Sequence, residues 1–150
     1  SILTIASVLA LAYVMNFSGQ TIAMGTFLAG LGTVYAVLAP ALGWIGTAVT
    51  GSDTSANALF SKLQVSAAEN LQHAGIHGAT PELMLAANTT GGVVGKMISP
   101  QSLAIAATSV DMEGKESDIL KAVLPWSFAM LVVVCILVFL QTNVLSFLVP

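Results

Sequence analysis

The sequence predicts an all-α polytopic membrane protein, and two observations carry this prediction. Hydrophobic residues make up 56% of the 150 residues and charged residues only 7%, whereas about 25% of residues in soluble domains are charged. Two polar, glycine-rich segments, 51–57 and 88–96, interrupt the apolar runs. Backbone that leaves a helix at membrane depth must be buried in protein or line a cavity. Such interruptions therefore indicate the binding site of a transporter.

The length of the chain indicates part of a larger carrier. At about 20 residues for each crossing, the chain would supply about five or six passes. This is few for a solute carrier but natural for one half of an inverted-repeat transporter. The chain begins with Ser1, and no basic segment precedes the apolar run at Ile2. We therefore expect residues 1–150 to be one half of a longer protein.

The first half of the chain predicts one membrane-spanning helix and one hairpin. The opening apolar run predicts a transmembrane helix over residues 1–17, and turn-prone polar residues follow it. The next run predicts a helical arm over 22–50, kinked at Pro40. Residues 54–72 predict a shorter, amphipathic returning arm. Together the two arms predict a re-entrant hairpin whose tip stops partway through the bilayer.

The second half predicts a broken transmembrane helix followed by an intact one. Residues 81–110 form the broken helix, with Pro81 in a first helical turn and the interruption at 88–96. Pro100 suits the first turn of its second half. After a charged loop, an apolar run predicts a last transmembrane helix over 119–148.

The two polar segments supply the residues predicted to bind substrate. A helix that starts inside a membrane directs unpaired N–H groups and about half a positive charge at the break. Transporters use such ends to hold substrate carboxylates, while carbonyl and side-chain oxygens serve coupling ions. The predicted substrate-binding residues are Ser52, Thr54, Ser55, Asn57, Asn88, Thr89, Thr90, Gly91, Gly92, Lys96, Ser99 and Gln101.

Two isolated charges suggest specific roles. Lys96 is the only charged residue between Glu82 and Asp111, and Asp53 is the only one before Lys62. An ionisable residue in a membrane region is by default a functional hypothesis. We expect Lys96 to counter a substrate carboxylate, and Asp53 to carry the coupling proton because dehydration disfavours its charged form. The alternative is that the two residues pair with each other or reach a membrane interface.

Several other classes of protein find no support in the sequence. The net charge is −3 and all four basic residues are lysines, so a nucleic-acid partner is not expected. The single Cys135 cannot form an internal disulfide. His73 and His77 lie in a glycine-containing loop without a third ligand nearby, so neither a metal nor a cofactor is predicted. No acid, base and nucleophile stand at motif spacing, and the chain is not expected to be an enzyme.

The segments from Gly51 to Phe60 and from Ala86 to Ser102 resemble the signature segments of the bacterial L-lactate permease family. The resemblance extends along the chain and aligns it with the carboxy-terminal portion of the family. It implies a multi-pass protein of the bacterial cytoplasmic (inner) membrane that imports L-lactate, glycolate and D-lactate with protons. The implied partners are this carboxylate substrate, protons, the lipid bilayer and the missing amino-terminal half. A homo-oligomer and the order of substrate preference stay open.

The family is similar to a broader ion-transporter group, whose repeats each contain a re-entrant hairpin and a broken helix. This similarity implies that the loop with His73 and His77 is external and that residues 111–121 are cytoplasmic. Lys115 and Lys121 agree with that orientation. Two other functions stay open: a noncatalytic membrane-embedded subunit or scaffold, and a carrier for another organic anion. An upstream inverted repeat in the complete sequence would favour the carrier.

Overall fold

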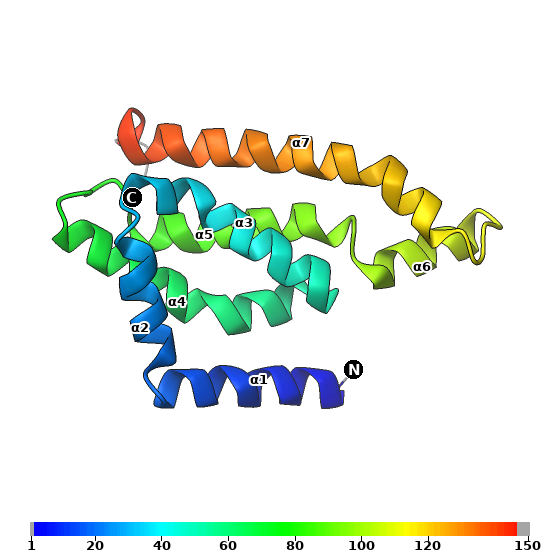
Figure 1. Cartoon of the computed structure of the whole chain (residues 1–150), viewed down its shortest axis with the longest axis horizontal. Helices are drawn as coiled ribbons and strands as arrows, with labels where there is room; N and C mark the ends of the chain where they lie inside the picture. The colour runs from blue at the N-terminus through cyan, green and yellow to red at the C-terminus, as the bar shows by residue number, and fades with distance from the viewer. Residues whose placement is uncertain (1, 147–150) are drawn as a thin grey trace.

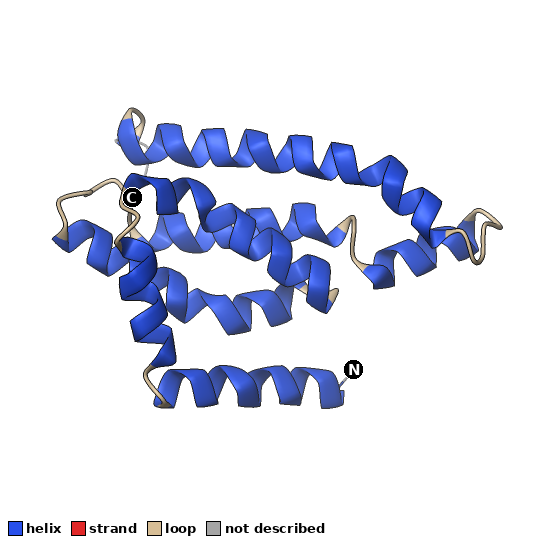
Figure 2. Ribbon diagram, viewed as in Figure 1, coloured by secondary structure: helices blue, strands red, loops and turns tan. Residues whose placement is uncertain are grey.

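The computed structural model describes residues 2–146, and the side-chain environments of all of these except residues 2, 4, 5 and 8. This part of the chain consists of α-helices joined by turns and loops, and it contains no strand (Figures 1 and 2). The helices are α1 (Ile2–Phe17), α2 (Gln20–Ala29), α3 (Thr33–Thr50), α4 (Asp53–His73), α5 (Pro81–Lys96), α6 (Pro100–Ser109) and α7 (Glu116–Asn143). The all-α prediction is confirmed.

Helices α3 and α5 form the centre of the fold. Both pack against α4 on one side and against α7 on the other, while α1 and α2 pack on α4 and α6 packs on α7. Figure 1 shows α1 and α7 at opposite edges of the molecule. Helices α3 and α4 run in opposite directions and form a helical hairpin with its tip at Gly51 and Ser52. Helices α5 and α6 follow this hairpin and are separated by residues 97–99.

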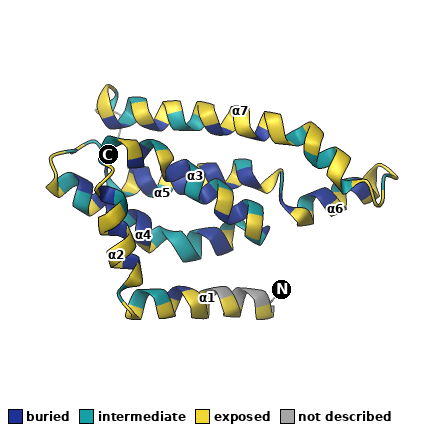
Figure 3. Ribbon diagram, in the orientation of Figure 1, coloured by how far each residue is buried: buried dark blue, intermediate teal, exposed yellow. Residues whose placement is uncertain are grey.

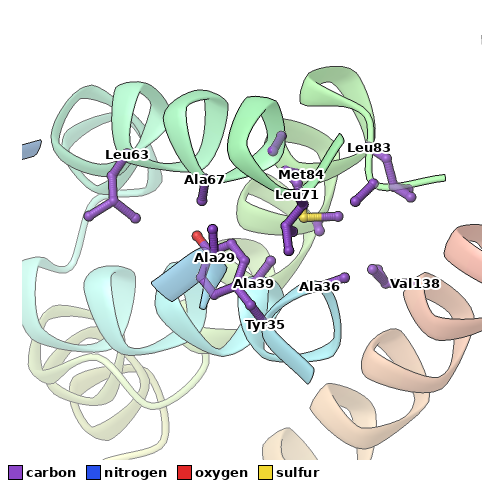
Figure 4. Close-up of a cluster of buried hydrophobic side chains, with 13 residues drawn as sticks. Ala29, Tyr35, Ala36, Ala39, Leu63, Ala67, Leu71, Leu83, Met84 and Val138 are labelled. Carbon is purple, nitrogen blue, oxygen red and sulfur yellow. The ribbon is translucent and has the colours of Figure 1, made fainter. Parts of the chain in front are cut away.

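The buried apolar side chains gather between α3, α4 and α5 (Figure 4). Tyr35 projects from α3, Leu63 and Leu71 from α4, and Met84 from α5, and each is at most 1% exposed. Most other members of the cluster are alanines. Small side chains allow helix backbones to approach closely, which is typical of helix packing inside membranes. The core is therefore thin, and it places polar residues of neighbouring helices within contact of one another.

Helix α7 leaves most of its apolar surface uncovered (Figure 3). Trp126, Phe128, Val133 and Leu137 are all more than half exposed, whereas Ser127, Leu131, Val138 and Thr142 are buried. Soluble monomers rarely expose a continuous apolar surface of this kind. This helix is therefore suited to contact lipid or further protein.

Two helices within the described residues are long and apolar enough to cross a bilayer, namely α3 and α7. Helix α1 has 16 residues and extends about 24 Å at 1.5 Å per residue, less than the about 30 Å of a hydrocarbon core. Helices α2 and α6 have 10 residues each. Two such helices are fewer than the number that the length alone predicts, because several helices are short.

Some predicted boundaries differ from the structure. Residues 22–50 form two helices rather than one, because a turn at Gly30–Gly32 separates α2 from α3 and Gly32 has a φ of +59°. Pro40 lies inside α3. The last helix starts at Glu116 and ends at Asn143, short of the predicted end at residue 148, which lies outside the described residues.

Residues 81–110 form two helices, α5 and α6, and the interruption between them is not where the sequence predicts it. Helix α5 continues to Lys96, so the predicted interruption at 88–96 is wrong, and residues 97–99 form the break. Pro81 and Pro100 occupy first helical turns as predicted, and the hydroxyls of Thr80 and Ser99 accept the capping N–H bonds. The glycines that suggested an interruption serve packing instead, as described below.

Candidate substrate site between the hairpin and the broken helix

The hairpin tip reverses the chain over only two residues. Gly51 ends α3 with a φ of +71°, a conformation that residues with a side chain rarely adopt. The Ser52 hydroxyl then accepts the Ser55 N–H at 3.3 Å and caps α4. Asp53 is therefore in the first turn of α4, where the positive end of the helix dipole favours a carboxylate.

Glycines bring α3 and α5 into backbone contact. A Cβ atom on Gly91 would lie closer than 3.0 Å to the backbone of Pro40, and one on Gly95 equally close to the backbone of Trp44. A Cβ on Gly43 of α3 would meet the backbone of Asn88. Gly91 and Gly95 are four residues apart, the small-xxx-small spacing of close helix pairs. This contact sets the distance between α3 and α5, and thereby the position of the polar residues of α5 relative to the hairpin.

The Asn57 side chain is the centre of a polar cluster between α4 and α5. Its Oδ1 accepts from Asn88 Nδ2 at 2.7 Å and from the Thr89 hydroxyl at 3.1 Å. Its Nδ2 donates to Asp53 Oδ2 at 3.2 Å. On the other side of the carboxylate, the Thr47 hydroxyl donates to Asp53 Oδ1 at 3.5 Å. The cluster joins a carboxylate to amide and hydroxyl groups drawn from three helices.

Gly92 is the position on α5 that faces the carboxylate. A Cβ atom there would lie closer than 3.0 Å to Asp53 Oδ1 and 2.8 Å from Thr47 Oγ1. The absence of a side chain at this residue therefore makes room for Asp53 against α5. The neighbouring Gly91 faces Pro40 instead, so the two consecutive glycines have different roles.

The second contact between the hairpin and the broken helix is at the tip itself. Lys96 Nζ donates to the Gly51 carbonyl oxygen at 3.0 Å, and the Gln101 side chain lies beside Gly51. The carbonyl belongs to the C-terminal end of α3, where a positive charge is favourable. Lys96 is exposed in this part of the chain. Its ammonium therefore stabilises the tip.

The alternative in which Lys96 pairs with Asp53 is not found in the structure. Among the described residues, the single ion pair within 4.0 Å joins Lys121 to Asp118, on the exposed first turns of α7. Asp53 contacts amide and hydroxyl groups instead.

The structure brings together some of the predicted substrate-binding residues and separates others. Asn88 and Thr89 donate to Asn57, which donates to Asp53. Gly92 lies against Asp53, while Lys96 and Gln101 contact Gly51. The other predicted residues lie outside these two contacts. Ser52 and Ser99 cap helices, and the Ser55 N–H donates to the Ser52 hydroxyl. Thr54 is exposed, and the Thr90 hydroxyl donates to the Ala86 carbonyl. Gly91 lies in the contact between α3 and α5. Because α5 is helical here, Gly91 and Gly92 do not form the unwound backbone that the sequence suggested.

Three residues of the cluster were not selected from the sequence: Thr47, Gln64 and Tyr35. Gln64 Nε2 donates to Asn88 Oδ1 at 3.1 Å, and the Tyr35 hydroxyl donates to Gln64 Oε1 at 2.6 Å. A signal for Gln64 was available, because Asp53, Asn57 and Gln64 follow helical spacing and lie on one face of α4. Tyr35 and Thr47 carried no such signal, since apolar residues surround both in the sequence.

Comparison with known proteins identifies the family. The model of the family described as L-lactate permease matches residues 1–145. The chain belongs to the L-lactate permease family. The family membership expected from segments 51–60 and 86–102 is confirmed.

Relatives within the family include permeases with two named substrates. The chain is 48% identical to an L-lactate permease of Bacillus subtilis and 44% identical to one of Escherichia coli, in each case over 99% of its length. It is 42% identical, over 97% of its length, to a glycolate permease of Escherichia coli. The chain spans about a quarter of the length of these relatives, 25% to 26%, and not the half expected from the sequence. No solved structure matches the chain.

Proposed function

We propose that this chain is the carboxy-terminal portion of a secondary transporter that imports L-lactate, glycolate and D-lactate together with protons. The observation that carries the proposal is membership in a family with relatives named for L-lactate and for glycolate. These two substrates share a carboxylate and a hydroxyl group on the neighbouring carbon. A common site for both must therefore offer partners to these two groups.

The polar cluster around Asn57 supplies partners of the required kind. The Thr89 hydroxyl is within 3.1 Å of both Asn57 Oδ1 and the Leu85 carbonyl, but it has one proton and donates to one of them at a time. Its lone pairs remain able to accept from a substrate hydroxyl. Thr89 and Thr90 are both exposed on α5. We propose that the substrate binds on this exposed face of α5, between α5 and the part of the permease that this chain lacks.

The charged groups suggest how the substrate carboxylate and the proton are handled. Lys96 is an exposed residue at the end of the same face of α5, and its ammonium has two further protons besides the one donated to Gly51 with which to bind a carboxylate. The Asp53 carboxyl group touches Asn57, which in turn touches Thr89. A proton on Asp53 and a substrate on Thr89 would therefore communicate through one amide group. In this proposal Asp53 carries the coupling proton.

The rest of the proposed transport cycle follows from the hairpin and the broken helix. In secondary transporters with inverted repeats, a site between the repeats is exposed to the two sides in turn. We propose that α3 and α4 are the re-entrant hairpin of one repeat and that the missing portion contains the other. The exposed face of α7 would then contact lipid in the bacterial cytoplasmic membrane.

Proteoliposomes that contain the complete permease test this proposal. An inward gradient of L-lactate or glycolate should acidify the lumen, as followed by an enclosed pH dye. The rate should exceed that of protein-free liposomes, which measures passive entry of the undissociated acid. Substrate uptake without the extra acidification would reject proton coupling. The absence of any flux above the protein-free rate, for these and other organic anions, would favour a scaffold.

A further inference from the structure

A continuous chain of hydrogen bonds runs from the apolar core to the hairpin tip. The Tyr35 hydroxyl donates to Gln64 Oε1, and Gln64 Nε2 donates to Asn88 Oδ1. Asn88 Nδ2 then donates to Asn57 Oδ1, and Asn57 Nδ2 donates to Asp53 Oδ2. Every bond in the chain donates in the same direction, toward Asp53.

Two groups that can only accept hydrogen bonds fix this direction. Gln64 Nε2 also donates to the Ala39 carbonyl oxygen at 3.2 Å, and the Asp53 carboxylate receives the last N–H. If the amides of Gln64, Asn88 and Asn57 all rotated by about 180°, so that oxygen and nitrogen exchanged places, Gln64 Oε1 would face the Ala39 oxygen. Two acceptors would then oppose each other without a proton between them. The orientation of Asn57 is therefore set partly at Ala39, across the core.

Burial makes this constraint effective. Gln64 and Asn88 are 0% exposed and Tyr35 is 1% exposed, so no water replaces a lost partner. Within the described part of the chain, no buried side-chain nitrogen or oxygen lacks a hydrogen-bond partner. If Asp53 becomes protonated, its end of the chain can accept either orientation of Asn57. The bond from Gln64 to Ala39 then remains as the constraint.

We propose that Gln64 is a positioning residue, which holds the Asn57 amide with its N–H toward Asp53 and its oxygen toward Thr89 in both protonation states of Asp53. The expected effect of Gln64 on transport rests on the proposed function. The expected effect of Gln64 on the orientation of the Asn57 amide does not. Gln64 itself does not touch the substrate face of α5. It acts through Asn88, which it holds from the opposite side of the core.

The ionisable groups near Asp53 do not offer another explanation. The helices packed against α4 carry Tyr13 on α1, Tyr35 on α3, and Glu82 and Lys96 on α5, while α2 carries none; α4 itself carries Lys62, Glu69 and His73. Within the described ranges none of these pairs with Asp53 within 4.0 Å. Lys96 reaches the neighbouring Gly51 carbonyl. The direct polar partners of the carboxyl group are Asn57 and Thr47.

The first measurement is independent of transport. In the complete permease labelled with ¹⁵N-asparagine and reconstituted in lipid, the Asn57 side-chain N–H signals are assigned by their loss in Asn57→Ala. Gln64→Met and Tyr35→Phe should shift or broaden these signals. Asn70→Leu is the control, because the Asn70 side chain donates to the Ser66 carbonyl of the same helix and lies outside the chain. Unchanged Asn57 signals in a folded Gln64→Met variant would overturn the inference, whatever the permease transports.

The second measurement is transport with a double-variant comparison. Gln64→Met should lower kcat/KM for L-lactate exchange about tenfold, the size expected for loss of the one hydrogen bond, to Asn88, through which Gln64 orients Asn57. In an Asn57→Ala background the same substitution should cost less than about twofold, because its target is already absent. Equal losses in the two backgrounds would mean that Gln64 serves only general stability, and would reject the positioning role. A wild-type permease without lactate or glycolate flux would reject the proposed function, while the Asn57 signals still decide the positioning.

Discussion

Adding one methyl group to either of two consecutive glycines should have opposite consequences. In Gly91→Ala the new Cβ would lie closer than 3.0 Å to the backbone of Pro40, where ordinary contact begins at 3.4 Å. Backbone atoms cannot rotate away, so α3 and α5 must separate. In Gly92→Ala the new Cβ meets the side chains of Asp53 and Thr47, which can change rotamer. The first substitution should therefore damage the fold and the second the polar cluster.

The magnitudes follow from these contacts. Overpacking a well-packed interface costs about 1 to 3 kcal/mol, and contact of two backbones places Gly91→Ala at the upper end. Replacing glycine by alanine inside a helix returns about 1 kcal/mol. The net loss for Gly91→Ala is therefore about 2 kcal/mol. For Gly92→Ala, an off-rotamer side chain costs about 0.5 to 1.5 kcal/mol, which the same helical gain offsets, so its stability should be near that of the wild type.

The two variants are compared in the complete permease by thermal unfolding in detergent and by proton-driven lactate accumulation in proteoliposomes. Gly91→Ala should lower the thermal midpoint clearly. Gly92→Ala should keep the midpoint while it lowers accumulation, because the carboxyl group of Asp53 is displaced. Ala122→Ser adds one atom at an exposed position of α7, away from the contact of α3 with α5, and serves as the control. Equal thermal midpoints for Gly91→Ala and Gly92→Ala would refute the assigned packing of α3 against α5.

Three further substitutions test other contacts. Asp53→Asn should abolish accumulation driven by a pH gradient while substrate exchange persists, since the amide mimics the protonated acid; a variant that still concentrates lactate would show that another group carries the proton. Lys96→Gln should raise the half-saturating lactate concentration about tenfold if the ammonium binds the carboxylate. A change below about fivefold would match the loss of helix capping at Gly51 alone, which is worth at most about 1 kcal/mol. Ser127→Ala removes the acceptor of Trp44 Nε1 at 2.9 Å and the donor to the Val94 carbonyl at 3.1 Å, so it should destabilise the protein by about 1 to 3 kcal/mol in thermal unfolding, whereas the exposed Ser109→Ala should have little effect.

The sequence alone was sufficient to predict those features of the fold that depend on residues adjacent in the chain. The low content of charged residues and the apolar runs predict membrane helices, because a bilayer accepts few other structures. Pro81 and Pro100 mark helix starts, since proline lacks the N–H that a first turn leaves unpaired anyway. Gly51 and Ser52 mark the chain reversal, because the positive φ of Gly51 and the Ser52 cap are both properties of the tip itself.

The tertiary structure decided what the glycines and amides do. Gly91, Gly92 and Gly95 are compatible both with an unwound backbone and with a close helix contact, and only the position of α3 selects the second. The break consequently lies at 97–99 instead of 88–96. In the same way, the partners of Asn57, Gln64 and Tyr35 come from three different helices. A sequence reveals which residues can donate and accept, but the direction of a hydrogen-bond chain depends on distant acceptors such as the Ala39 carbonyl, which become neighbours only when the helices pack.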